Sequence, residues 1–435
     1  MPIVPRPAWP PNTVSRVATG TQRGALGAVA LVVACAEGAA RALAPRGGTI
    51  ASAPVDPAEH FDAAQIARAK RYGRGQLALG AAGAATEAVL LVALVRRDRR
   101  GRTPAGSLRA VAARGAGLSL GLAVAPLPFT ALMRKRAIDA KLATQSWPAW
   151  AADVARSTAL AAGFASTGAV VVGALMRRYG ERWWAPAAAG SVGVAVLVTL
   201  AGPVLLEPIF NDFTPLEDGE LRREVLALAE RAGVRIGEVF EVDASRRTSA
   251  ANAYVSGLGV TRRVVLFDTL TSTFTMEEAR TVVAHELAHV RYRDVPRLLA
   301  FAAIVAPAGT RAVAAVAQRL DERETPGLPA LALAGAFVSS AVGIVARRLS
   351  RAVERRADSF ALALTDAPEA FVSFERRITR QNLADPDPPR WLTRLLATHP
   401  PIVERIGIAD AYAAGERPTP RPGRPRLLLR TRAGS

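Results

Sequence analysis

The sequence predicts a mostly α-helical membrane protein, in which a polytopic bundle of about seven spanning helices is joined to an α+β domain with a small β-sheet. Half of the 435 residues are hydrophobic although the formal net charge is +19, which is unusual for a soluble protein. The hydrophobic residues are gathered into long runs, most of which approach the ~20 residues that cross a bilayer as a helix. Short β-branched segments follow in the second half of the chain.

Seven apolar runs account for the predicted spans. They are residues 24–40, 75–95, 115–133, 157–176, 185–206, 298–317 and 327–346. A large soluble helical core would imitate some of these Ala- and Gly-rich runs, but seven in one chain favour membrane spans. The first run begins late and lacks a small-residue cleavage site, so we interpret it as a span and not as a cleaved signal peptide.

Two acids, Glu37 and Glu87, lie inside the first two runs. A carboxylate at such depth is costly against lipid, so each is expected to face a protein-lined or watery interior. The alternative is that the spans are shifted and the acids lie near an interface.

The α+β region is predicted between the fifth run and residue 290. Residues 216–232 have the pattern of an amphipathic helix with acids in its first turn. Residues 238–243 and 263–268 have strand patterns and flank a Gly-containing segment at 251–259. A small sheet here would let an extended peptide add as one more strand.

The most informative segment is His285-Glu286-Leu287-Ala288-His289. Residues four apart share one helix face, so His285 and His289 can bind one metal ion with Glu286 beside it. Such spacing also arises by chance on solvated helices, but the chain has only four histidines and the flanking residues are apolar. The pattern predicts one Zn²⁺ per chain, with Glu286 as the general base that accepts a proton from the attacking water.

A third ligand is expected from a later helical pattern at residues 351–362. Glu354 and Asp358 lie one turn apart there, on one face. We assign Glu354 as the third zinc ligand and Asp358 as the acceptor that fixes the tautomer of a ligating histidine. An exposed helix with Arg–acid pairs is the alternative, and this segment alone would favour it.

These two motifs together resemble the gluzincin metallopeptidases, and in particular the membrane-embedded type I CaaX prenyl protease family. Further segments resemble the start of that family's catalytic domain, its substrate-edge segment and its C-terminal motif, at residues 206–216, 249–259 and 398–406. The resemblance covers roughly residues 150–410, and the N-terminal part matches only in hydropathy. It implies an integral-membrane zinc-dependent endopeptidase with a zincin-like catalytic domain and a peptide or membrane-protein substrate.

The resemblance also implies roles for single residues. Asn252 and Ala253 match positions that hold the substrate backbone beside an edge strand. His399 and Arg405 match catalytic groups that stabilise the oxyanion when the carbonyl becomes tetrahedral. Without the resemblance, Asn252 would be interpreted as a turn residue, His399 as a helix cap and Arg405 as a solvated charge.

Two alternatives to CaaX-type processing remain at this point. A quality-control protease that clears damaged membrane proteins would use the same chemistry, and the sequence does not decide between these substrates. A non-catalytic membrane transport or binding protein with a vestigial motif would explain the acids in the spans, but it would leave the histidines and the later carboxylate without a purpose. The sequence leaves the oligomeric state open.

Basic residues beside the spans predict the orientation. Arginines precede and follow the hairpin at 298–346, whose connecting loop at 321–324 is acid-rich, so the zinc helix is expected to face the cytoplasm. The arginine-rich loop at 96–102 disagrees, because counting about seven spans places it outside. The Ala- and Arg-rich composition indicates a GC-rich genome, and we expect the plasma membrane of a bacterium.

The positive charge is explained by the lipid bilayer and not by nucleic acid, because the arginines cluster beside spans and in a tail without interleaved aromatic residues. The single cysteine, Cys35, excludes a disulfide within the chain and a cysteine metal site. The predicted organisation is a membrane bundle over 1–206, a zinc metallopeptidase domain over 207–414 interrupted by the hairpin, and a basic, Pro/Arg-rich disordered tail over 415–435.

Overall fold

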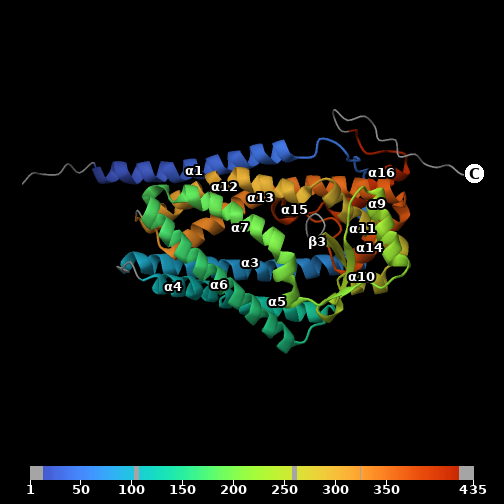
Figure 1. The fold of residues 1–435 in the computed structure, drawn as a ribbon, viewed down its shortest axis with the longest axis horizontal. Helices are drawn as coiled ribbons and strands as arrows, with labels where there is room; N and C mark the ends of the chain where they lie inside the picture. Colours follow the sequence, from blue (N-terminus) through green and yellow to red (C-terminus); the bar gives the residue numbers. More distant parts are fainter. Residues whose placement is uncertain (1–12, 102–106, 257–261, 324, 421–435) are drawn as a thin grey trace, which may run out of the picture.

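The computed structural model describes residues 13–101, 107–256, 262–323 and 325–420. The molecule is elongated, and its long helices run roughly along the long axis (Figure 1). The sheet and most of the shorter helices are gathered at one end, which is the right-hand end of the view. The long helices therefore form one part of the molecule and the α+β elements cap it.

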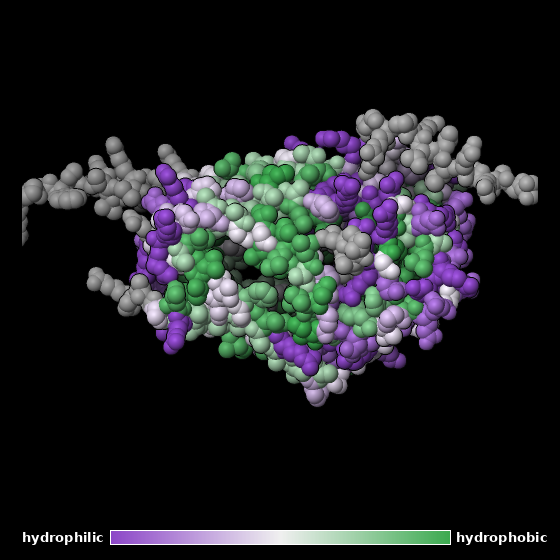
Figure 2. Space-filling view, in the orientation of Figure 1, coloured by the Kyte–Doolittle hydropathy of each residue, from purple (hydrophilic) through white to green (hydrophobic). Residues whose placement is uncertain are grey.

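Within the described residues, six helices are long and apolar enough to cross a membrane. They are α1 (Thr13–Leu43), α3 (Ala63–Arg100), α6 (Trp147–Tyr179), α7 (Trp184–Leu205), α12 (Asp294–Asp321) and α13 (Leu328–Thr365). The pair α4 (Leu108–Val124) and α5 (Leu127–Asp139) passes the same test across a bend of 41°, which gives up to seven spans. Figure 2 shows an apolar surface over the middle of these helices with polar residues at both ends. The prediction of a polytopic bundle of about seven spans is confirmed.

The last span carries more than its apolar run. α13 has 38 residues, so it is about 57 Å long, against a hydrocarbon core of about 30 Å. It continues without a break from the apolar run at 327–346 to Glu354 and Asp358. Glu354 follows the end of that run by roughly 12 Å along the helix axis. The predicted third ligand is therefore held close to the membrane surface.

The arginines at 96–100, which were predicted to lie in a loop, form the end of α3, and Arg99 among them lies beside the end of α12. Arg99 contacts Glu322 at 2.8 Å and donates to the carbonyl of Leu320 at 2.7 Å. The ends of α3 and α12 lie at the end of the molecule away from the sheet (Figure 1). Acids from the later loop thus offset part of the positive charge of residues 96–101.

The acid in the first span contacts protein partners. Glu37 accepts from Arg348 of α13 at 2.6 Å and lies 3.8 Å from Arg41 on its own helix. It therefore faces another helix, as the cost of a lipid-facing carboxylate predicts. Glu87 of α3 is half-buried.

The sheet has four strands in the order β1-β2-β4-β3. They are β1 (Phe213–Pro215), β2 (Glu238–Val242), β3 (Ala253–Ser256) and β4 (Arg263–Phe267). β2 and β4 are parallel, and the outer pairs are antiparallel. The two predicted strands correspond to β2 and β4. β1 and β3 were not predicted as strands, because each has at most four residues and strand patterns need a longer alternation.

The shorter helices pack on the sheet and on the end of α13. They are α2 (Pro57–His60), α8 (Glu207–Phe210), α9 (Glu220–Arg231), α10 (Asp268–Thr273), α11 (Met276–Arg291), α14 (Pro368–Gln381), α15 (Arg390–Leu396) and α16 (Ile402–Ala413). α9 confirms the helix predicted at 216–232, but it begins later because the Leu216 N–H bonds to the Val239 carbonyl of β2.

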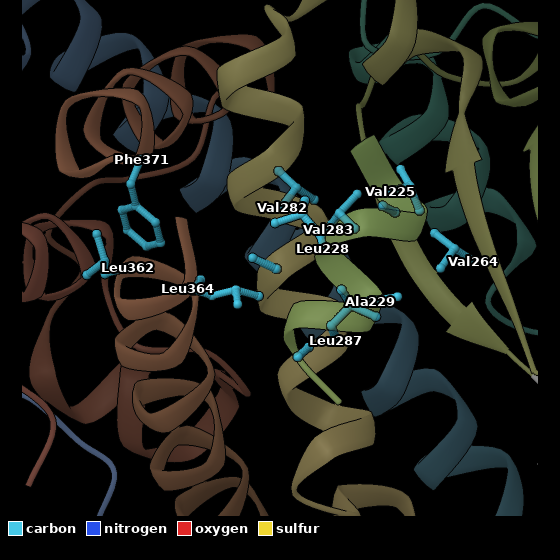
Figure 3. Close-up of a cluster of buried hydrophobic side chains, with 14 of the residues drawn as sticks. Val225, Leu228, Ala229, Val264, Val282, Val283, Leu287, Leu362, Leu364 and Phe371 are labelled. Carbon is cyan, nitrogen blue, oxygen red and sulfur yellow. The ribbon is translucent and has the colours of Figure 1, made fainter. Parts of the chain in front are cut away.

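One apolar core holds α9, α11 and the sheet together (Figure 3). Leu228 of α9, Val264 of β4, and Val283 and Leu287 of α11 are each at most 1% exposed. Burial of a side chain of this size contributes roughly 1.5–3 kcal/mol. Leu362 of α13 belongs to the same core, so the two helices with the predicted zinc ligands are packed against each other through apolar contacts.

The connection between α1 and α3 crosses the α+β elements as a strap over residues 44–62. The Ile50 N–H donates to Ser359 Oγ of α13, and the Ala53 N–H donates to the carbonyl of Gly407 in α16, each at 2.9 Å. A Cβ at Gly407 would lie 2.1 Å from the Ala53 carbonyl oxygen, so glycine permits this approach. The strap was predicted to belong to the N-terminal bundle, but it packs on the later part of the chain.

The first residues of the predicted disordered tail are placed. Thr419 exchanges backbone hydrogen bonds with Gly48 and Thr49 of the strap, at 2.8 and 3.1 Å. Residues 421–435 of that tail lie outside the described residues, as does Glu324 of the acid-rich loop. The division of the chain into a bundle, a metallopeptidase domain and a tail remains a prediction.

Candidate metal centre

The helix with the histidine motif is α11, and its start is fixed by a capping box. Thr275 accepts from the Glu278 N–H, and Glu278 in turn accepts from the Thr275 N–H. This exchange satisfies two of the donors that a helix N-terminus leaves free. Glu278 also binds Arg377 and Ser373 of α14. α11 is therefore held rigidly between the sheet and α14, which fixes the direction of its histidines.

The structure brings the three predicted ligands together. The Nε2 atoms of His285 and His289 lie 3.2 Å apart. Glu354 places Oε2 at 3.2 Å from His285 Nε2 and Oε1 at 3.8 Å from His289 Nε2. One ligand atom from each residue lies within 4.8 Å of the others. The spacing of two histidines along one helix and one acid on a second helix therefore converges on a single point.

These residues fit a metal ion. Glu354 Oε2 is buried and has no hydrogen-bond partner, which is costly for a carboxylate oxygen unless a cation contacts it. Two imidazole nitrogens with one carboxylate oxygen form a donor set typical of a catalytic zinc site with an open position. No other group of His, Cys, Asp or Glu in the described part of the chain has such a geometry.

Asp358 lies beside the first histidine. Its Oδ1 lies 2.9 Å from His285 Nδ1. A hydrogen bond from Nδ1 to this carboxylate leaves Nε2 as the nitrogen that faces the other ligands. Burial alone would lower the pKa of His285, but the Asp358 and Glu354 carboxylates raise it to about 10. The carboxylates that favour a proton on this imidazole also attract a divalent cation, which would take the place of that proton.

The second histidine has an orienting acid that the sequence analysis missed. Asp294 Oδ2 lies 3.1 Å from His289 Nδ1, and Asp294 Oδ1 accepts from Arg356 and Arg297. Asp294 is 3% exposed and Arg356 is 1% exposed. The acid was missed because it begins α12, after Arg293 turns the chain in the left-handed region with a φ of 56°, so helix-face spacing did not apply. The signal available was an acid five positions after the second histidine.

Replacing Asp294 by Asn is expected to weaken zinc binding by roughly 10- to 100-fold, because the amide is a weaker acceptor for His289 Nδ1 and no longer balances the charge of Arg356. A titration of the metal-free protein with zinc against a competing chelator measures this. Asp321→Asn, at the other end of α12, is a matched control because Asp321 is also buried but contacts Gly327 and Arg323. Equal affinity in the Asp294 variant and the wild type would contradict the orienting role.

Arg405 of α16 is enclosed by acids. Its Nε and one Nη donate to both oxygens of Asp358 at 3.0 and 2.6 Å, and the other Nη lies 2.7 Å from Glu375 Oε1. Burial alone would lower the pKa of the guanidinium, but these carboxylates raise it above its ordinary value. All three nitrogens of Arg405 thus contact an acid, and the cation balances the buried charge around His285.

Glu375 of α14 was not predicted. It is fully buried, and burial raises its pKa to about 7. The pattern of residues 368–381 does not distinguish Glu375 from an ordinary acid on the solvated face of an amphipathic helix. Its contact with Arg405 and its place in the lining of the cleft beside the ligands connect it with the metal centre.

Glu286 lines a cleft of about 430 Å³ beside the ligands. Other lining residues are Asn252, His285, Glu375, His399 and Arg405. Burial raises the pKa of Glu286 above its ordinary value, which suits a carboxylate that exchanges protons near neutral pH. The cleft therefore gathers the predicted base and the predicted substrate and oxyanion groups in one space.

Of the remaining predicted residues, His399 and Asn252 line this cleft, and Ala253 follows Asn252 in β3. His399 precedes α16, and its Nε2 lies 3.4 Å from Glu354 Oε2, while Nδ1 lies 2.9 Å from Thr398 Oγ1. Asn252 is exposed at the start of β3, and its Oδ1 accepts from the Ala253 N–H at 2.9 Å. The side chain of Ala253 is buried, so only its backbone can contact a substrate.

Comparison with known proteins gives a consistent assignment. Residues 215–413 match the family described as peptidase family M48. The uncharacterized metalloprotease YhfN of Bacillus subtilis is 30% identical over 304 residues, which cover 67% of this chain and 71% of that protein. CAAX prenyl protease 1 of Saccharomyces cerevisiae is 41% identical over 109 residues, or 25% of this chain and 24% of that protein.

The match to the CAAX prenyl proteases is partial in length. The homolog from Arabidopsis thaliana is 32% identical over 218 residues, which cover 48% of this chain and 51% of that protein. Among solved structures, the crystal structure of S. mikatae Ste24p superposes with a TM-score of 0.70 at 18% identity, over 93% of this chain and 100% of that one. This superposition establishes the fold over nearly the whole molecule, including the membrane helices.

Proposed function

Because this chain belongs to peptidase family M48 and is a membrane metalloendopeptidase, we propose that it hydrolyses peptide bonds with one zinc ion per chain and with Glu286 as general base. The observation that carries this proposal is the convergence of His285, His289 and Glu354 on one point beside Glu286. The alternative of a non-catalytic transport protein has no support, since the relatives are named as proteases.

His285, His289 and Glu354 would hold the zinc ion through Nε2, Nε2 and a carboxylate oxygen. When bound, zinc supplies Lewis acidity and lowers the pKa of water towards neutrality. Asp358 and Asp294 keep the Nδ1 atoms of the histidines hydrogen-bonded, so that both Nε2 atoms face the same point. These contacts fix the ligands before substrate arrives.

Glu286 accepts the proton of the water that attacks the peptide carbonyl and then donates it to the leaving amine. His399 stabilises the oxyanion, since its side chain is 60% exposed, lines the cleft and holds Nε2 3.4 Å from the ligand Glu354. Arg405 supports the same charge at longer range, because Asp358 and Glu375 hold its guanidinium in place. Asp358 and Glu375 thereby also position the catalytic groups.

The substrate backbone binds along β3. β3 is an edge strand, and the Phe267 N–H of β4 bonds to the Asn252 carbonyl. Backbone groups of successive residues alternate between the two sides of an antiparallel strand, so those of Ala253 face the open edge. An extended peptide can therefore pair with Ala253, while Asn252 contacts its backbone and its scissile bond approaches Glu286.

Substrates are proposed to be peptide segments close to the membrane surface, because α13 carries both a span and Glu354. The name CAAX prenyl protease 1 suggests one class of such substrates, and damaged membrane proteins are another with the same chemistry. We place the protein in a bacterial plasma membrane with this centre on the cytoplasmic side, and we expect no nucleic-acid partner.

The proposal is tested with purified protein in lipid nanodiscs and an unstructured peptide that carries a fluorophore and a quencher. A zinc chelator is expected to abolish cleavage, and added zinc is expected to restore it. The non-chelating isomer of the same compound is the control. Cleavage that persists in metal-free protein would show that zinc is not required.

A further inference from the structure

A hollow lined by arginines lies between α3 and α5, and none of the three predicted zinc ligands lines it. Its volume is about 570 Å³. It is lined by Arg68, Arg71, Tyr72, Arg136, Asp139, Ala140 and Leu383, and we call it the basic hollow. Its walls are the first part of α3, the last part of α5 and the segment that follows α14. None of these arginines has a role in the proposed peptidase mechanism.

The depth of the basic hollow follows from the neighbouring spans. Gln76 of α3 donates to the Met133 carbonyl of α5 at 3.2 Å, so these residues lie at one level. The apolar run of α3 begins at this level, and that of α4 and α5 ends there. Arg136 contacts the carbonyl oxygens of Arg71 and Tyr72 at 3.4 and 3.3 Å, one turn further out. The hollow therefore lies about 5 Å beyond the apolar segments, at the depth of lipid headgroups.

A third helix marks the same level with aromatic residues. α6 begins with Trp147 and Trp150, and Arg134 of α5 lies over both rings at 5.2 and 5.4 Å. Tryptophan gathers where a span meets the headgroup region. The starts of α3 and α6 and the end of α5 thus indicate one membrane interface, on the side of the molecule where the sheet lies (Figure 1).

The charge of the basic hollow is not balanced by the protein. Arg68 and Arg71 are exposed, and neither forms an ion pair within the described part of the chain. The one acid in the lining, Asp139, contacts Lys135 at 2.8 Å. Further cations at this level are Lys70 and Arg74, and Asp385 is an acid near them. Arginines arranged round a concave surface match the geometry of a phosphate group.

We propose that the basic hollow binds the headgroup of an anionic phospholipid, with its phosphate between Arg68 and Arg71. The acyl chains then follow the apolar surface of α3 and α5 into the bilayer. Basic pockets between spans at a membrane surface bind anionic headgroups in this way. Leu383, in the segment after α14, also lines the hollow. A bound lipid would therefore contact both the spans and the segment that follows the helix with Glu375.

The test uses the full chain in nanodiscs of phosphatidylcholine, with and without phosphatidylglycerol. Retained phosphatidylglycerol is counted by native mass spectrometry, and the unfolding temperature is measured in parallel. Phosphatidylglycerol is expected to bind and to raise the unfolding temperature. Arg68→Gln with Arg71→Gln is expected to weaken binding roughly 10- to 30-fold and to remove most of the stabilisation, while Arg68→Lys with Arg71→Lys retains part of it.

The matched control is Arg96→Gln with Arg97→Gln. These exposed arginines lie at the opposite end of α3, so the variant changes the charge of the same helix by the same amount. It is expected to bind phosphatidylglycerol as the wild type does. Equal weakening in both variants, or no effect of phosphatidylglycerol on the wild type, would overturn the proposal. Full competition by inorganic phosphate would assign the hollow to a free anion instead of a lipid.

Discussion

The Glu286→Gln variant is expected to retain its zinc and to lose peptide cleavage by about 10²- to 10⁴-fold in kcat/KM. Glutamine has nearly the same shape as glutamate, but its amide cannot accept a proton from the attacking water. Glu286 lines the cleft and is not one of the three converging ligands, so its replacement leaves the metal-binding atoms in place. Cleavage of a fluorogenic peptide and the zinc content of the purified variant measure the two effects separately.

Glu277→Gln is a matched control for this experiment. Glu277 lies on the same helix, but its side chain is 58% exposed and contacts Arg280. Its replacement is expected to change the cleavage rate less than twofold, because Glu277 does not line the cleft. The loss of its surface ion pair changes the folding stability by only about 0–1 kcal/mol. If Glu286→Gln cleaved at the wild-type rate with full zinc content, Glu286 would not be the general base.

The Arg405→Ala variant is expected to lose about 3–5 kcal/mol of folding stability, because it leaves the Asp358 carboxylate buried without its counter-charge. Asp358 is fully buried, so its carboxylate has no contact with bulk water. Denaturant unfolding of the purified protein, with zinc and without it, measures the loss.

A second variant separates the structural role of Arg405 from its support of the oxyanion. Arg405→Ala combined with Asp358→Asn removes the unpaired charge together with its partner, so it is expected to recover part of the stability but not the cleavage rate. Arg390→Ala, at the exposed start of α15, is the control for loss of a surface arginine. An unchanged unfolding midpoint in Arg405→Ala would contradict its place as the buried counter-charge.

The sequence predicted the features that depend on local periodicity. The apolar runs indicated the spans because a bilayer imposes a minimum length. His285 and His289 were placed on one face by helix geometry, and Glu354 and Asp358 were found in the same way. The distances among His285, His289 and Glu354, all below 4.8 Å, agree with that interpretation.

The features that the sequence did not predict depend on contacts between distant segments. Asp294 and Glu375 reach the centre from α12 and α14, and their neighbours in the sequence give no sign of burial. From the sequence alone, Arg405 would be interpreted as a solvated charge. Its side chain is only 14% exposed, because it is enclosed by acids from two other helices. The strap at 44–62 joins the α+β part through Ile50, which is buried in the same core, and through hydrogen bonds to residues more than 300 positions later. No periodic pattern encodes such contacts.

The central claim is that His285, His289 and Glu354 hold one zinc ion, and metal analysis combined with zinc X-ray absorption spectroscopy of the purified protein tests it most directly. We predict about one zinc per chain, a coordination shell with two imidazole nitrogens, and loss of the metal in Glu354→Ala. A wild-type protein without zinc, or a zinc signal that lacks imidazole and persists in Glu354→Ala, would contradict it.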